Sequence, residues 1–329
     1  MSPGARARLR RVAGWCITIL ALGFFVERVV ANGAHMPPIA WSLATAGIAV
    51  VSVVLALGAI VLSGLAWWVL LSDQRAGAPI WRVIPLFLVS QFGKYLPGNV
   101  GQFVGRVVLA RDAGIPPPLT LATMVTEVLW NVGTALGVSA LAMYLFVGTR
   151  VASLPPWMDV TGLCACFVAL LAAPWVGTTL LRRVFPGVVA KVFSGSELRP
   201  PGWLAALKVS ALYVACYACL GSALDLQARF MFSAPSASLV EVSGFFALAW
   251  LAGYLLPGAP AGIGVRESVM LVLLAPLYGE STAIALGITL RLASTLADAL
   301  ALLAGWYWRS IGDRRTQHPK GISSAHGEE

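Results

Sequence analysis

The chain has 329 residues, of which 58% are hydrophobic and only 11% are charged, and its mean hydropathy is +0.81. A soluble domain carries roughly a quarter charged residues, so this composition excludes a water-soluble fold. The net charge of +9 does not indicate a nucleic-acid partner, because Lys and Arg lie in short groups between apolar runs, without interleaved stacking aromatics. We expect no nucleic-acid partner, no metal and no cofactor.

Long apolar runs predict an all-α polytopic membrane protein. The first run follows a group of arginines and is long enough to cross a ~30 Å hydrocarbon core, so we interpret it as an uncleaved anchor rather than a signal peptide. The sequence predicts one membrane domain over residues 1–310, with repeat halves at about 42–150 and 204–308, and a disordered cytoplasmic tail over 311–329. In chain order, the predicted full spans are residues 12–31, 42–71, 119–148, 160–181, 204–224 and 282–308.

Two further apolar regions, residues 83–111 and 239–279, are each interrupted near the middle by Pro-Gly. The interruptions, Pro97-Gly98 and Pro257-Gly258, lie in similar segments 160 positions apart. Each half is short for a full crossing, which predicts two re-entrant broken hairpins. Such paired interruptions point to a transporter's binding site, because unwound backbone at membrane depth is tolerated only where it faces protein or a water-filled cavity.

The distribution of basic residues predicts the orientation in the membrane. If the N-terminus is cytoplasmic, both termini lie inside and the outside loops keep only Arg150 and Arg229. This result requires that both broken regions return to the side that they entered. Three full spans separate them, so they enter from opposite faces and form an inverted repeat, as in many secondary transporters. The loop Leu181–Lys208 is either an ordinary amphipathic connector or a lipid-sensing element on the cytoplasmic leaflet.

Ionisable residues inside spans are costly, so each is a functional hypothesis. Lys94 lies just before the first break, where freed backbone N–H groups and a half-helix N-terminus can hold an anion. Arg106 and Arg266 follow their breaks at equal distance, and two guanidinium forks at mid-membrane suit a phosphate. The predicted substrate-binding residues are Lys94, Asn99, Gln102, Arg106, Arg266 and Arg291.

The alternative is that these cations only pair with acids and lock helices together. Arg266 is followed by Glu267, and Arg291 shares a predicted helix with Asp298. Glu127 has no local cation, so it either neutralises Arg106 across helices or titrates as a coupling-proton site. We therefore assign coupling or ion-pair roles to Glu127, Glu267 and Asp298.

The segment from Gly93 to Arg106, GKYLPGNVGQFVGR, resembles the signature of the lysylphosphatidylglycerol synthase transmembrane-region family, a flippase-like domain family. Residues 260–267 and 291–298 are similar to its second-half signatures, and the resemblance covers about residues 10–310. It implies a bacterial inner-membrane protein that moves a phospholipid or related amphiphile between leaflets. Bifunctional members carry a soluble aminoacyl-transferase domain after this region, but only about twenty polar residues follow Trp308, so we expect a standalone member. Typical members also have Arg after the acidic residue that matches Glu127, where this chain has Val128.

Two functional classes remain open at this point. The first is flipping of a phospholipid or other phosphate-bearing lipid, with the two hairpins lining a central cavity. The alternative is a non-transporting, lipid-binding accessory protein of a glycolipid, hopanoid or polyprenyl-lipid pathway, which recruits a separate lipid-modifying enzyme through the loop 182–208. A third class, a membrane-embedded transferase, is disfavoured because the sequence shows no catalytic acid pair or metal-ligand spacing. We therefore expect no enzymatic activity.

Overall fold

The computed structural model describes residues 3–96, 100–148, 200–256 and 260–316, together with residues 172, 175–177, 179–180, 182–184 and 186–187. Every regular element in these ranges is a helix. Five of the described segments are long and apolar enough to cross a membrane. The chain is therefore an all-α polytopic membrane protein, as its composition predicts. Of the predicted span 160–181 only residues 172, 175–177 and 179–180 are described, and about half of the connector 181–208 lies outside the described residues.

The helices occur in two series with the same order: a long helix, a short helix, a break, a short helix and a long helix. Each helix of the second series begins about 160 positions after its counterpart in the first. The first series follows α1 (Pro3–Asn32) and η1 (Gly33–His35), and comprises α2 (Leu43–Asp73), α3 (Ile80–Gln91), η2 (Phe92–Tyr95), α4 (Gly101–Asp112) and α5 (Pro117–Gly148). The second comprises α8 (Trp203–Met231), α9 (Leu239–Leu255), η4 (Pro260–Gly262), α10 (Val265–Tyr278) and α11 (Glu280–Thr316).

The long helices correspond to the predicted full spans, with α1, α2, α5, α8 and α11 over the expected residues. Their outward faces carry exposed large apolar side chains such as Val54, Leu207 and Leu303. Exposed tryptophans lie near helix ends, at Trp81 and Trp203 among others, as is common at membrane–water interfaces. The apolar surface thus suits lipid contact along the helices.

Both interrupted regions fold as a short helix, a break and a second short helix. The 12 residues of α3 and of α4 reach about 18 Å each, and the 17 and 14 residues of α9 and α10 reach about 25 and 21 Å, all short of a ~30 Å core. Residues Pro260–Tyr278 together are long enough to cross, but Ala261 has a φ of 50° and interrupts the helix. The segment is therefore a broken one, as the sequence predicts.

A glycine at the same position of each repeat holds each hairpin closed. A Cβ at Gly93 would lie 2.5 Å from the backbone N of Gln102, and a Cβ at Gly253 would lie 3.1 Å from Cα of Gly262. The two ends of each break therefore approach so closely that only glycine fits without a shift of the backbone. This explains why the duplicated motif begins with glycine in both halves.

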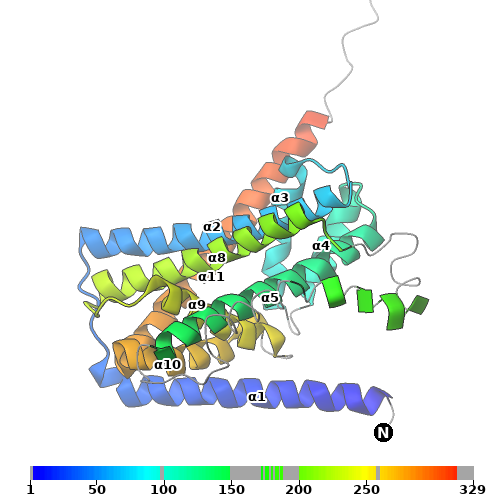
Figure 1. Cartoon of the computed structure of the whole chain (residues 1–329). Helices are drawn as coiled ribbons and strands as arrows, with labels where there is room; N and C mark the ends of the chain where they lie inside the picture. The colour runs from blue at the N-terminus through cyan, green and yellow to red at the C-terminus, as the bar shows by residue number, and fades with distance from the viewer. Residues whose placement is uncertain are drawn as a thin grey trace, which may run out of the picture.

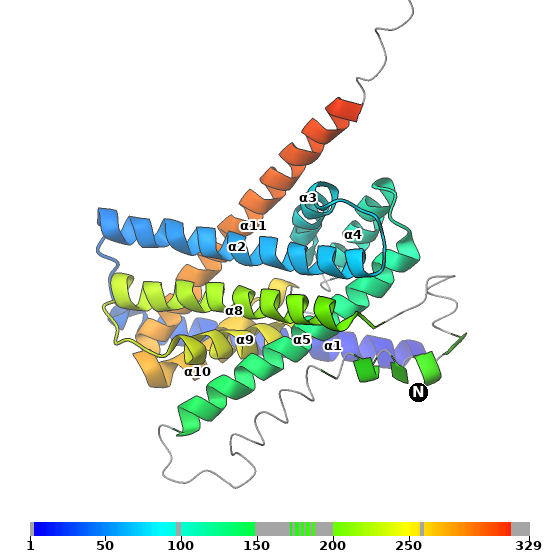
Figure 2. The same cartoon turned by 45° about the horizontal axis from the view of Figure 1, so that its top comes forward.

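Figures 1 and 2 show how the two series are arranged. Helices α2 and α8, which are counterparts in the repeat, pack side by side along their length. Helices α3 and α4 lie toward the end of the bundle at which α1 begins, whereas α9 and α10 lie toward the other end. The described flanks of the two breaks meet, because η2 contacts η4, and η2 also contacts the tilted α11.

The last helix is longer than the sequence predicts. Helix α11 runs to Thr316, six residues into the region that we expected to be a disordered tail. A helix that already spans an apolar core adds each further residue without a new nucleation step, so polar composition alone places its end too early. The rest of the predicted tail, 317–329, lies outside the described residues.

Candidate functional site

A cavity of about 200 Å³ lies beside the contact between η2 and η4, the flanks of the two breaks. Residues of both repeats line it, because η2 and α4 come from the first hairpin and α9, η4 and α10 from the second. Seven of the predicted site residues line this cavity: Lys94, Gln102, Arg106, Glu127, Arg266, Arg291 and Asp298. The fold thus brings together charged residues that are up to about 200 positions apart in the chain.

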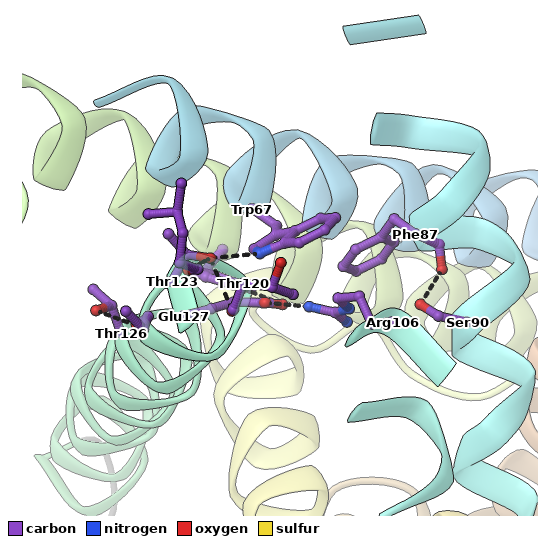
Figure 3. A network of polar contacts seen from close by, with 11 residues as sticks. Trp67, Phe87, Ser90, Arg106, Thr120, Thr123, Thr126 and Glu127 are labelled. Carbon is purple, nitrogen blue, oxygen red and sulfur yellow. Dashed lines mark hydrogen bonds and ion pairs between the residues drawn. The ribbon is translucent and has the colours of Figure 1, made fainter. Parts of the chain in front are cut away.

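In the first repeat, Arg106 of α4 forms an ion pair with Glu127 of α5, as Figure 3 shows. Only 2% of the Arg106 side chain is exposed, and its Cζ lies 4.3 Å from the ring centroid of Phe87 and 5.0 Å from that of Trp67. The hydroxyl of Tyr213 donates to the other oxygen of Glu127 at 3.3 Å. The structure thus contains the ion pair across helices that was one of the two alternatives for Glu127.

In the second repeat, one carboxylate faces two arginines. Oε1 of Glu267 lies 3.3 Å from Nε of Arg266 and 3.4 Å from Nη1 of Arg291. Its other oxygen accepts a 2.8 Å hydrogen bond from the backbone N–H of Gly264, which caps the start of α10. Arg291 also donates to the carbonyl oxygen of Ala261 at 3.0 Å. The predicted pairing of Arg266 with Glu267 is confirmed, but Glu267 is shared.

Arg266 is the least satisfied cation of the described cavity wall. Its Nε and Nη2 are buried and make no hydrogen bond to any described residue, whereas Arg106 leaves only Nε in that condition. The guanidinium Cζ of Arg266 lies 5.8 Å from the ring centroid of Phe246, so an aromatic face supports it as Phe87 supports Arg106. Nε lies within ion-pair distance of Glu267 but makes no hydrogen bond to it, and buried donors without hydrogen bonds are costly.

A third ion pair joins the two repeats. Nζ of Lys94 lies 2.6 Å from Oδ1 of Asp298, and the hydroxyl of Tyr95 donates to Oδ2 at 2.6 Å. The alternative pairing of Arg291 with Asp298 is wrong. Seven residues separate them, or about 10 Å along the helix axis, and each turns to a partner outside α11 instead.

These contacts leave an excess of positive charge. Four cations, Lys94, Arg106, Arg266 and Arg291, face three carboxylates, those of Glu127, Glu267 and Asp298. Lys94 and Arg106 each have a carboxylate of their own, so the net charge of +1 belongs to the pair Arg266 and Arg291. At membrane depth an unbalanced charge is expensive, and a monovalent anion would neutralise it.

The sequence analysis did not predict several aromatic and amide residues of the cavity wall, among them the four residues Asn131, Tyr217, Trp250 and Tyr254. Asn131 follows Glu127 by one helical turn, and Tyr217 follows Tyr213 by one turn. The four-residue spacing places each of them on the same face as a residue bound to the charged network. That four-residue spacing is the sequence signal that could have identified Asn131 and Tyr217. Tyr254 lies inside the duplicated motif itself.

Several predicted positions lie outside the described residues: Asn99 and the break residues Pro97, Gly98, Pro257 and Gly258. Beside the second break the backbone is irregular, with positive φ angles at Ala261, Gly262 and Gly264. Beside the first, η2 is a short 3-10 helix that ends at Tyr95. The described flanks therefore show a change of backbone conformation at both breaks.

The comparisons with known proteins agree with this architecture. No curated protein matches the chain. The model of one protein family, described as the lysylphosphatidylglycerol synthase TM region, matches residues 11–301, which cover most of the chain and all of the cavity residues. The protein with this duplicated helix–break–helix fold therefore belongs to the lysylphosphatidylglycerol synthase transmembrane-region family.

Proposed function

We propose that this protein moves a phosphate-bearing lipid between the leaflets of the bacterial inner membrane. The observation that carries the proposal is Arg266, a buried guanidinium with two nitrogens that lack hydrogen-bond partners, in a cavity whose described charges sum to +1. A phosphodiester carries one negative charge and oxygens that accept from a guanidinium fork in a bidentate manner. Such a headgroup satisfies the donors and balances the charge at once.

Comparison of the two repeats supports the position of the phosphate. In the first repeat Glu127 pairs with Arg106, whereas in the second repeat Arg266 shares Glu267 with Arg291. The second repeat thus lacks the dedicated carboxylate that the first one has. We propose that the lipid phosphate takes the corresponding role at Arg266.

The arrangement of the repeats supports a transport mechanism. We propose that α3–α4 and α9–α10 are re-entrant hairpins of an inverted repeat, entering from the cytoplasmic and the outer face respectively, with both termini in the cytoplasm. Their positions toward opposite ends of the bundle in Figure 1 favour this reading. In such a repeat the binding site lies at the interface of the halves, which rock against each other to open it to either side. The Lys94–Asp298 contact, which joins the halves, would then break and reform in each cycle.

We propose a transport role rather than a catalytic one. The three carboxylates of the network, Glu127, Glu267 and Asp298, are each held by at least one cation within 3.4 Å. Both oxygens of each carboxylate already accept from groups of the protein, so none of the three is a free base that faces the cavity. Their geometry suits charge balance around a bound headgroup.

The test is leaflet exchange in liposomes by the purified protein. A fluorescent phosphatidylglycerol should exchange between leaflets, whereas a diacylglycerol carrier of the same fluorophore should show no acceleration over protein-free liposomes. Arg266→Gln should abolish the protein-dependent rate. Binding of phosphatidylglycerol without exchange would favour the alternative, an accessory protein that presents lipid to a separate enzyme.

A further inference from the structure

The cavity has an uncharged wall that the phosphate proposal does not use. It consists of Asn131 of α5, Tyr217 of α8, and Trp250 and Tyr254 of α9, and we call it the aromatic wall. The rings of Trp250 and Tyr254 are stacked, with centroids 4.7 Å apart and planes 13° apart. Tyr217 meets Trp250 edge to face at 5.9 Å. The wall is thus a pre-ordered surface of amphipathic rings.

Polar groups of this wall are available to a ligand. The hydroxyl of Tyr217 donates to Oδ1 of Asn131 at 2.7 Å, which holds the amide in place. Asn131 lines the cavity, and no described residue accepts a hydrogen bond from its Nδ2, which leaves this donor for a ligand. Gln102, on another side of the cavity, adds a second amide. Rings with a few fixed donors and acceptors are typical of sites that orient an uncharged polar ligand.

The same wall is unsuited to a cationic headgroup. Each carboxylate of the network already has a cation of the protein within 3.4 Å, so none is left to pair with an ammonium group. The excess charge of the described network is positive, which repels a further cation in a medium of low dielectric constant. The stacked faces of Trp250 and Tyr254 are also turned to each other, so these two rings do not form a cage around a cation.

We infer that the aromatic wall binds an uncharged, hydroxyl-rich headgroup, a sugar ring or comparable polyol, whose lipid phosphate sits on Arg266. The inference rests on the proposed function and narrows its substrate class. It assigns headgroup selection to Asn131, Tyr217, Trp250 and Tyr254, and charge recognition to Arg266. An aminoacylated, cationic lipid headgroup is therefore a poor substrate for this protein.

The test compares three fluorescent lipids with identical acyl chains in liposomes that contain the wild-type protein. Phosphatidylinositol has a polyol headgroup, phosphatidylethanol has the same charge without hydroxyls, and lysylphosphatidylglycerol carries a net positive charge. We expect phosphatidylinositol to exchange at least about tenfold faster than the other two, which corresponds to about 1.4 kcal/mol. Equal rates for phosphatidylinositol and phosphatidylethanol, or faster exchange of lysylphosphatidylglycerol, would overturn the inference and leave phosphate transport intact.

If no lipid exchanges, the proposed function fails, and the inference is decided by binding instead. Native mass spectrometry of the detergent-solubilised protein should then retain phosphatidylinositol in preference to phosphatidylethanol. Retention without this preference would overturn the inference as well.

Variants of the wall separate headgroup selection from folding. Trp250→Leu should lower phosphatidylinositol exchange to the rate of phosphatidylethanol, whereas Trp203→Leu, at a tryptophan that is 75% exposed outside the cavity, should not change the ratio. Because Trp250→Leu can impair folding, Asn131→Asp is the second variant. It adds an unpaired carboxylate of nearly the same shape, and should raise the ratio of lysylphosphatidylglycerol to phosphatidylinositol exchange at least about tenfold. An unchanged ratio in Asn131→Asp would contradict a headgroup site at this wall.

Discussion

Arg106 and Arg266 occupy equivalent positions of the two hairpins, yet only Arg106 has a carboxylate of its own. Each guanidinium lies against an aromatic ring, Phe87 for Arg106 and Phe246 for Arg266. Arg106 is paired with Glu127, while Arg266 shares Glu267 with Arg291, and its Nε and Nη2 make no hydrogen bond to any described residue. The two equivalent arginines thus differ in how completely their donors are satisfied by described residues.

The first prediction concerns the proposed binding of a lipid phosphate by Arg266. Arg266→Lys keeps the charge but loses the planar fork, so exchange of phosphatidylglycerol should fall about tenfold or more while thermal stability changes little. Exchange rates in liposomes at matched protein content measure the effect. Near-normal exchange by Arg266→Lys would show that charge alone is required and would remove the argument for bidentate phosphate binding.

The second prediction concerns the structural role of Arg106. Arg106→Gln leaves the buried carboxylate of Glu127 without its cation and should lower the free energy of unfolding by about 3–5 kcal/mol. The double variant Arg106→Gln, Glu127→Gln removes both charges and should recover most of this loss. Unfolding of the single and the double variant in detergent, monitored by tryptophan fluorescence, measures both free energies of unfolding. A stable Arg106→Gln protein that has lost transport would instead place Arg106 in contact with the substrate.

The third prediction concerns the contact between the repeats. Lys94→Gln leaves Asp298, whose side chain is only 3% exposed, with Tyr95 as its remaining partner, so both stability and exchange rate should decrease. The double variant Lys94→Asp, Asp298→Lys swaps the two charges and should restore part of the lost stability and part of the lost lipid exchange rate. If the swapped protein is no better than the single variants, the pair does not act as an ion pair between the halves.

The fourth prediction concerns the close approach inside the first hairpin. Gly93→Ala places a Cβ within 2.5 Å of backbone atoms, and should destabilise the protein by about 2 kcal/mol or more and reduce exchange. Gly105→Ala is the matched control in α4, because its Cβ would meet nothing within 4 Å. It should be neutral or stabilising by up to about 1 kcal/mol, since Ala favours a helix over Gly. Similar effects of both substitutions on the unfolding transition would argue against the close contact.

The fifth prediction concerns the topology. In a background without the native cysteines, His35→Cys should react with an impermeant maleimide added to intact cells, because the inside excess of basic residues places the α1–α2 connection outside. Ser72→Cys, at the other end of α2, should react only after the cells are opened. The reverse pattern would invert the proposed orientation and place the termini outside.

The sequence by itself determined the class of protein, the positions of the breaks and the set of candidate charges. These features are local, because the length of an apolar run and the presence of Pro and Gly decide whether a segment can cross a membrane as one helix. The repeat could also be recognised from the sequence, because two similar motifs stand 160 positions apart in it. Composition alone placed the end of α11 too early, because the helix continues through polar residues to Thr316.

Only the tertiary structure decided which charge is paired and which is available. The pairs join residues that are 21, 24 and 204 positions apart, so the partner of a given arginine depends on how whole helices pack. The same holds for the aromatic wall, whose residues come from three helices. Sequence spacing suggested a pair between Arg291 and Asp298 on one helix, but burial in a low-dielectric core makes the nearest available partner across helices the more stable choice, and that partner is set by packing.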